Sequence, residues 1–192
     1  DAAPCVLLTC HWGAGGCVWK LLRARGIHAW FLARRPQVGD LGSGRVSAWY
    51  GRLRGWALGR IGSLGPLFTG GSSARVLQAL ALGQGVVGML DLPARSAQAG
   101  TTLPLLDGTV HFPDGLARLA ERAGVGVVLF SCGLDPRNGR RNLRVETLAA
   151  GTAANETMRR YAAHLNRRLR EESAYWQIWR EARTLFVEAA DH

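Results

Sequence analysis

The chain has 192 residues, of which 47% are hydrophobic, and its formal net charge is +10. These values exclude a disordered chain and allow a single α/β domain with a full core. No apolar run approaches the roughly 18 residues that span a bilayer, so no membrane-crossing segment is expected. A chain this basic favours an anionic partner, and the spread of its basic residues along the sequence argues against nucleic acid.

The predicted elements alternate between strand and helix, because short apolar runs predict strands and apolar positions three or four apart predict helices. Strands are expected at residues 6–10, 27–32, 86–90, 103–106, 125–132 and 143–146. Helices are expected at residues 15–25, 46–58, 72–82 and 113–123 and from residue 152 onward, with a glycine-rich connector at 62–71. This alternation predicts one α/β domain over residues 1–192, with a mixed, mostly parallel central sheet flanked by helices.

The last helix has two distinct sides. An apolar stripe predicts a buried face and consists of Met158, Tyr161, Leu165 and Leu169. A basic flank predicts a face toward solvent or an anionic surface and consists of Arg159, Arg160, Arg167, Arg168 and Arg170.

Several kinds of active site are missing from the sequence. It contains no G-x-S-x-G elbow, no P-loop and no complete dinucleotide fingerprint. The four cysteines, at positions 5, 10, 17 and 132, show no C-x-x-C pair, and no His, Asp or Glu cluster has metal-ligand spacing. The sequence therefore predicts free thiols, no bound metal and no cofactor.

A histidine marks the turn between the first strand and the first helix. His11 is followed by a glycine-rich run that includes Gly13, Gly15 and Gly16. Imidazole titrates near neutrality and can take a proton from a hydroxyl or amine, while glycine N–H groups at a helix start can stabilise an oxyanion. A histidine that is only held by local hydrogen bonds is the equally open alternative. Asp91, at the end of the strand 86–90, is either catalytic or a cap of the next turn.

Further motifs follow this histidine in a fixed order. They are Arg34-Arg35-Pro36, Arg52 or Arg54 in the segment 50–55, Gly85 to Asp91, Leu116 to Ala120, and Tyr175 to Arg180. In this order the chain resembles the lysophospholipid acyltransferase superfamily, specifically the late lipid A acyltransferases of the lauroyl and myristoyl type. The resemblance covers nearly the whole chain.

The resemblance implies a glycerol-3-phosphate-acyltransferase-like fold and transfer of a fatty acyl group from acyl carrier protein or coenzyme A. The acceptor would be a hydroxyl or amine of a lipid or glycolipid, with His11 as general base and Asp91 as a second catalytic residue. Substrate would bind to Arg34, Arg35, Arg52 and Arg54. The expected location is the cytoplasmic face of the inner membrane, with peripheral binding to its anionic surface and an N-terminal anchoring segment missing from this sequence.

The chain departs from the family at one position. The family's first motif places an acid five residues after the histidine, and here that residue is Gly16. Such an acid orients the histidine. Two hypotheses stay open: another acid, Asp91 or Asp114, approaches His11 in space, or the protein is a degenerate, non-catalytic member that binds lipid, carrier protein or a partner enzyme.

Overall fold

The computed structural model describes residues 3–13, 16–34, 49, 53, 63–92, 100–135 and 137–186. Within these residues the strands are β1 (Cys5–Thr9), β2 (Ala29–Ala33), β3 (Ser63–Phe68), β4 (Gly85–Met89), β5 (Thr101–Leu105), β6 (Gly108–Phe112), β7 (Gly126–Leu134) and β8 (Arg141–Leu148). The helices are α1 (Cys17–Ala24), α3 (Ser73–Ala81), α4 (Gly115–Ala123) and α5 (Ala154–Glu172), followed by the 3₁₀ turns η2 (Ser173–Tyr175) and η3 (Trp179–Thr184).

Six of the strands form one central sheet in the order β3-β2-β4-β1-β7-β8. All neighbours in it are parallel except β7 and β8, which form an antiparallel hairpin at one edge. The prediction of a mixed, mostly parallel sheet in one α/β domain is therefore confirmed. β1 and β2 are parallel, as expected for strands joined by a helix, but β4 lies between them.

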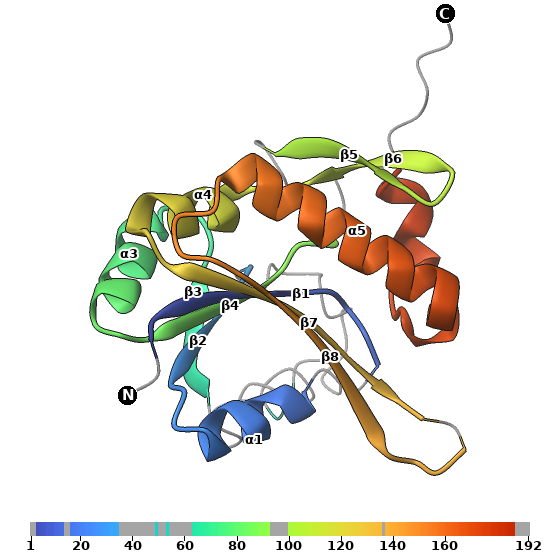
Figure 1. The fold of residues 1–192 in the computed structure, drawn as a ribbon, viewed down its shortest axis with the longest axis horizontal. Helices are drawn as coiled ribbons and strands as arrows, with labels where there is room; N and C mark the ends of the chain where they lie inside the picture. Colours follow the sequence, from blue (N-terminus) through green and yellow to red (C-terminus); the bar gives the residue numbers. More distant parts are fainter. Residues whose placement is uncertain are drawn as a thin grey trace, which may run out of the picture.

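Helices cover both faces of the sheet (Figure 1): α1 lies on one side, and α3, α4 and α5 lie on the other. The alternating side chains of β1 supply both cores. Val6 and Leu8 belong to the larger core under α3, α4 and α5, whereas Leu7 packs with Val18 and Trp19 of α1. A strand buried on both faces explains why residues 5–9 read as a continuous apolar run.

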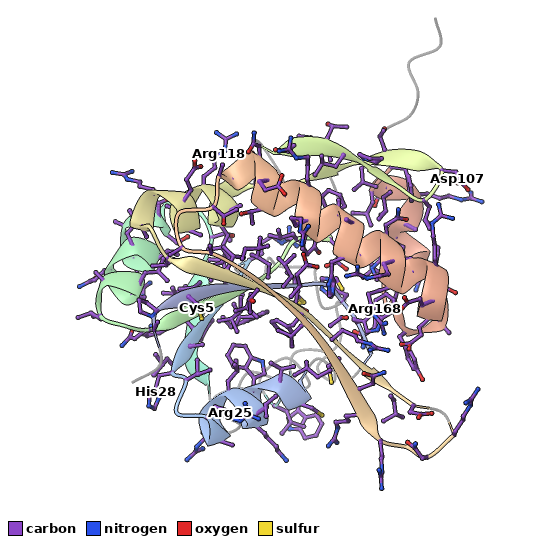
Figure 2. The ribbon with its side chains drawn as sticks, viewed as in Figure 1. Cys5, Arg25, His28, Asp107, Arg118 and Arg168 are labelled. Atoms are coloured by element: carbon purple, nitrogen blue, oxygen red, sulfur yellow. The ribbon has the colours of Figure 1, made fainter. Side chains whose placement is uncertain are left out.

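The apolar stripe of α5 is buried as predicted, since each of its four residues is at most 3% exposed. The predicted basic flank is wrong at one position. Arg168 is only 1% exposed, lies with its guanidinium 5.6 Å from the centre of the Trp12 ring, and pairs with Glu171 and Glu172. Figure 2 labels it beside α5, far from the peripheral Arg118.

Two segments differ from their prediction. The connector expected at residues 62–71 contains β3, which lies at the edge of the sheet, where a proline such as Pro66 costs no ladder hydrogen bond on its open side. The short strand expected at 103–106 is one arm of the hairpin β5–β6, whose turn places Leu106 at a positive φ of 53°. The sequence pattern missed β6 because its alternation is too short to stand out, with only Val110 and Phe112 apolar around His111.

Most of the helix predicted at residues 46–58 lies outside the described residues. Trp49 and Leu53, which are described, are both helical and exposed. No described helix combines the length and apolar character that crossing a bilayer requires.

Candidate active site

The sheet register brings two of the predicted site residues together. β1 and β4 are parallel neighbours, and Thr9 of β1 is paired with Met89 of β4. His11 and Asp91 each lie two residues beyond this pair, so both emerge at the carboxyl ends of adjacent strands. Open α/β sheets bind ligands at this edge. The acid that Gly16 cannot supply thus comes from the neighbouring strand.

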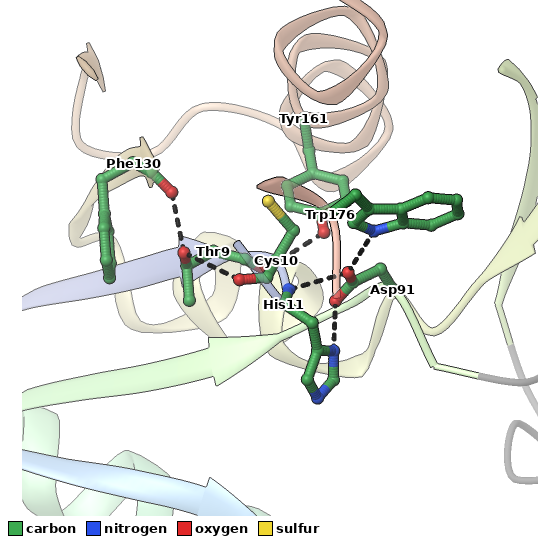
Figure 3. A network of polar contacts seen from close by, with 7 residues as sticks. All are labelled: Thr9, Cys10, His11, Asp91, Phe130, Tyr161 and Trp176. Atoms are coloured by element: carbon green, nitrogen blue, oxygen red, sulfur yellow. Dashed lines mark hydrogen bonds and ion pairs between the residues drawn. The ribbon is translucent and has the colours of Figure 1, made fainter. Parts of the chain in front are cut away.

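The carboxylate of Asp91 is fully buried and is held by three nitrogen atoms (Figure 3). Its Oδ1 lies 2.9 Å from Nδ1 of the His11 ring. Its Oδ2 accepts the main-chain N–H of His11 at 2.8 Å and the indole N–H of Trp176 at 2.9 Å. An ionised carboxylate is acceptor-only, so its bond to Nδ1 places the ring proton on that nitrogen and makes Nε2 the basic one. The His11 side chain keeps 24% of its surface exposed, which leaves the ring accessible to a substrate.

A C-terminal segment, residues 173–178, crosses the histidine turn and is here called the strap. Trp12 and Trp176 form an isolated antiparallel bridge. Within it Gln177 donates its main-chain N–H to the carbonyl of His11, and Gly13 donates its own to the carbonyl of Tyr175, each at 2.8 Å. The side chain of Gln177 also donates to the carbonyl of Gly13 at 2.7 Å.

This bridge corrects the role predicted for Gly13. Its N–H is bonded to Tyr175, so the expectation that it donates to an oxyanion is wrong for this structure. Gly13 is instead required by the turn: its φ is +39°, and a Cβ atom would lie 2.9 Å from the carbonyl oxygen of Cys132. Gly16 starts α1, and α1 has no acid in its first turn. Gly15 lies outside the described residues.

A pocket of about 250 Å³ opens beside His11. His11, Gly16 and Gln177 line its polar part. Thr9, Cys10, Trp12 and Gly13 also line it. The remaining wall is apolar and comes from α1 and the α1-facing side of the sheet: Val18, Trp19, Leu22, Phe31, Val87, Met89 and Phe130. Trp19 and Phe31 meet edge to face, with ring centroids 5.9 Å apart. The pocket suits a ligand with a long apolar part and a polar end near the histidine.

The groups behind the histidine are kept neutral. Burial, and then the charge of Asp91, raise the pKa of the Cys10 thiol well above its ordinary value. The same two causes raise the pKa of Tyr161, whose hydroxyl donates to the carbonyl of Thr9 at 3.1 Å. Burial also raises the pKa of Cys132. Because a thiolate is the reactive form of cysteine, these two cysteines are poor nucleophiles.

Asp114, the other acid considered for His11, does not contact it in the structure. Asp114 accepts hydrogen bonds from Thr101 and Arg118 instead, at 3.0 and 2.8 Å. Arg34 follows β2 and is exposed, and Arg35, Arg52 and Arg54 lie outside the described residues. Among the residues that the structure describes, no group of three or more His, Cys, Asp or Glu side chains is placed to hold a metal ion.

Sequence reasoning missed the part that Trp176 takes in this site. In the sequence, Trp176 and Trp179 stand out only as part of the motif Tyr175 to Arg180. Trp176 is buried, whereas Trp179 is 44% exposed. No sequence signal indicated the hydrogen bond to Asp91, because 85 positions separate the two residues.

The site is a histidine–aspartate pair at the carboxyl ends of parallel strands, with a largely apolar pocket beside it. No protein-family model matches the chain, and no curated protein matches it significantly.

Proposed function

We propose that the protein is an acyltransferase of the lysophospholipid acyltransferase type, similar to the late lipid A acyltransferases. It would move a fatty acyl group from acyl carrier protein or coenzyme A to a hydroxyl or amine of a lipid or glycolipid. One observation carries the proposal: the His11–Asp91 pair, joined at 2.9 Å, stands at the mouth of an apolar pocket. The pair supports proton transfer and the pocket supports an acyl chain.

The proposed reaction needs only one base. Nε2 of His11 takes the proton of the acceptor O–H or N–H as that atom attacks the thioester carbonyl. The resulting imidazolium is stabilised by Asp91, which holds the ring through Nδ1. When the tetrahedral intermediate collapses, the carbon–sulfur bond breaks and the leaving thiolate takes the proton from Nε2. Histidine is thereby restored, and no metal or cofactor is part of the scheme.

The start of α1 is the best-placed source of oxyanion stabilisation. Gly16, the residue that caps α1, lines the pocket together with Val18 of its first turn. The first N–H groups of a helix have no partner within the helix, and its N-terminus carries a partial positive charge. We therefore propose that main-chain N–H groups of this first turn, and not that of Gly13, stabilise the oxyanion.

The proposed partners also include an anionic membrane surface, at the cytoplasmic face of the inner membrane. The hairpin β7–β8 supports peripheral binding. On the face of β8 that carries Val145, exposed aliphatic side chains, Leu143 and Val145, lie beside the basic Arg141, and the hairpin turn adds Arg137 and Arg140. Val145 is paired with Phe130, a residue of the pocket wall, so this surface adjoins the proposed acyl site.

The test is transfer of a labelled acyl group from carrier-protein and coenzyme A donors to a panel of lipid and glycolipid acceptors. Wild type should transfer, and His11→Ala should abolish transfer. His28→Ala is the matched control, because His28 is an exposed histidine of the described region outside the pocket. Absence of transfer by wild type with every acceptor, or transfer that survives His11→Ala, would contradict the proposal.

A second candidate is a non-catalytic binder of lipid, carrier protein or a partner enzyme. The missing acid in the first turn of α1 favours it. Asp91 weighs against it, since a decayed site has no reason to keep a fully buried carboxylate on its histidine. Retained lipid or carrier binding without transfer in the same experiment would support this candidate.

A further inference from the structure

Asp91 is a short side chain whose carboxylate plane must be fixed before one oxygen can face His11. Both donors that fix it act on the same atom, Oδ2: the main-chain N–H of His11 and the indole N–H of Trp176. With Oδ2 occupied from two directions, Oδ1 is the oxygen left toward the ring nitrogen Nδ1.

Trp176 is itself held in place. Its side chain is 2% exposed, and its ring meets the ring of Trp179 edge to face, with centroids 4.8 Å apart. Trp179, the residue just after the strap, donates its indole N–H to the carbonyl of Ser173 at 2.7 Å and so links the two ends of the strap. The indole that reaches Asp91 is therefore a preorganised donor rather than a mobile surface group.

The strap also fixes the other partner of the pair. Its Gln177 N–H bonds to the carbonyl of His11, and its Tyr175 carbonyl accepts the N–H of Gly13. One short segment thus sets the main chain of the histidine and the carboxylate orientation of the aspartate. Two groups that must meet within a few tenths of an ångström gain from being positioned by one rigid element.

We infer that Trp176 is a positioning residue of the His11–Asp91 pair and that the strap is part of the active site. Its role is to keep Oδ1 of Asp91 on Nδ1 of His11, so that Nε2 is the basic nitrogen toward the substrate. The effect on rate rests on the proposed function, whereas the effect on the hydrogen bond does not.

The experiment removes one N–H and keeps the ring. Trp176→Phe does this with a smaller side chain, and replacement of Trp176 by 3-benzothienylalanine does it at nearly constant shape. Trp30→Phe is the matched control, because it removes an indole N–H that donates to Gln84 instead of Asp91, at a residue outside the pocket. The ring proton on Nδ1 of His11 is followed by NMR in the resting protein, assigned by its loss in His11→Gln, and kcat and KM are measured separately.

With the indole N–H removed, the Nδ1 proton resonance should shift upfield or broaden by exchange, and kcat should fall about tenfold at nearly constant KM, as expected for one hydrogen bond to a charged group. Trp30→Phe should change neither. If Trp176→Phe does not fold, the benzothienyl variant decides. An unchanged resonance together with an unchanged kcat would overturn the inference. If wild type transfers no acyl group, the proposed function fails and the resonance alone decides about Trp176.

Discussion

Asp91 contacts His11 twice, once at the main-chain N–H and once at the ring Nδ1. Replacing Asp91 by Asn keeps the size of the side chain but removes the charge, and an amide that donates toward Nδ1 selects the wrong ring tautomer. We expect Asp91→Asn to lower kcat for acyl transfer by about 10⁴-fold, as for the orienting carboxylate of a serine-protease triad. The check is kcat of Asp91→Asn beside Asp114→Asn, since Asp114 binds Arg118 instead of His11. A loss of less than threefold, or an equal loss in both variants, would remove Asp91 from the mechanism.

Gly16→Glu should not raise activity. The family's acid would be restored by this change, but Asp91 already occupies the Nδ1 side of the ring. An added Cβ at Gly16 meets no atom within 4 Å, so the variant should fold. An acid at a helix start contributes about 0.5 kcal/mol through the helix dipole. Urea unfolding should show that small gain. A clear rise in the transfer rate would mean that the Asp91 pair is incomplete.

Gly13→Ala should destabilise the protein by about 3 kcal/mol, because alanine at positive φ is strained and its Cβ would overlap a carbonyl oxygen. That oxygen belongs to Cys132 and would be 2.9 Å away. Gly139→Ala separates the two causes. Gly139 also has a positive φ, of 66°, but nothing lies within 4 Å of its added Cβ, so it should cost only about 1 kcal/mol. Equal losses in the free energy of unfolding, measured with urea, would show that the contact with Cys132 contributes nothing.

We expect His164 to lower the free energy of unfolding in acid. Burial, and then the charge of Arg167, lower the pKa of its ring from 6.5 to about 4. Its Nε2 lies 3.2 Å from the hydroxyl of Ser131, and among the described residues Nδ1 has no hydrogen-bond partner. As the pH falls, the unfolded chain therefore binds this proton before the folded protein does. The contribution of the neutral ring to the free energy of unfolding is complete above pH 6.5 and is lost as the pH falls toward 4.

Between pH 7 and pH 5 this loss amounts to about 2 kcal/mol in the free energy of unfolding. His164→Gln should remove it, so its stability falls less steeply over that range. His28→Gln, which changes an exposed histidine, should follow wild type. Urea unfolding at the two pH values makes the comparison, and parallel slopes for wild type and His164→Gln would refute the assignment.

Binding to anionic vesicles should depend on the hairpin β7–β8. Removal of two arginines, Arg140→Gln with Arg141→Gln, should weaken binding to anionic liposomes, measured by co-sedimentation, by about 30-fold, since each basic residue near such a surface contributes about 1 kcal/mol. Binding of wild type should rise with anionic lipid and fall with salt. Arg159→Gln is the control, because this arginine lies on α5 in an ion pair with Glu156. Equal recovery of wild type with neutral and anionic vesicles at low salt would refute membrane binding and leave an acidic carrier protein as the partner of this surface.

The amino-acid sequence alone predicts the class of fold and the first half of the site. Apolar runs and helical spacing placed β1, β4, β7 and α5 within a few residues, because the hydrophobic effect leaves a periodic signal along each element. The strand-to-helix turn at His11 was visible for the same reason. Segments whose stability comes from pairing, such as β3 at the sheet edge and β6 in its hairpin, carry a weaker local signal and were missed.

The groups that surround His11 come together only in the folded chain. The register of β1 against β4 places Asp91 on its ring, and the strap places Trp176 on that carboxylate. At Arg168 the tertiary structure contradicts the local pattern. Helical spacing assigns this residue to the basic flank of α5, whereas the fold buries it against Trp12. Local spacing reports which face of an element is apolar, whereas contacts between residues 80 or more positions apart depend on strand order, which a single sequence does not encode in any short window.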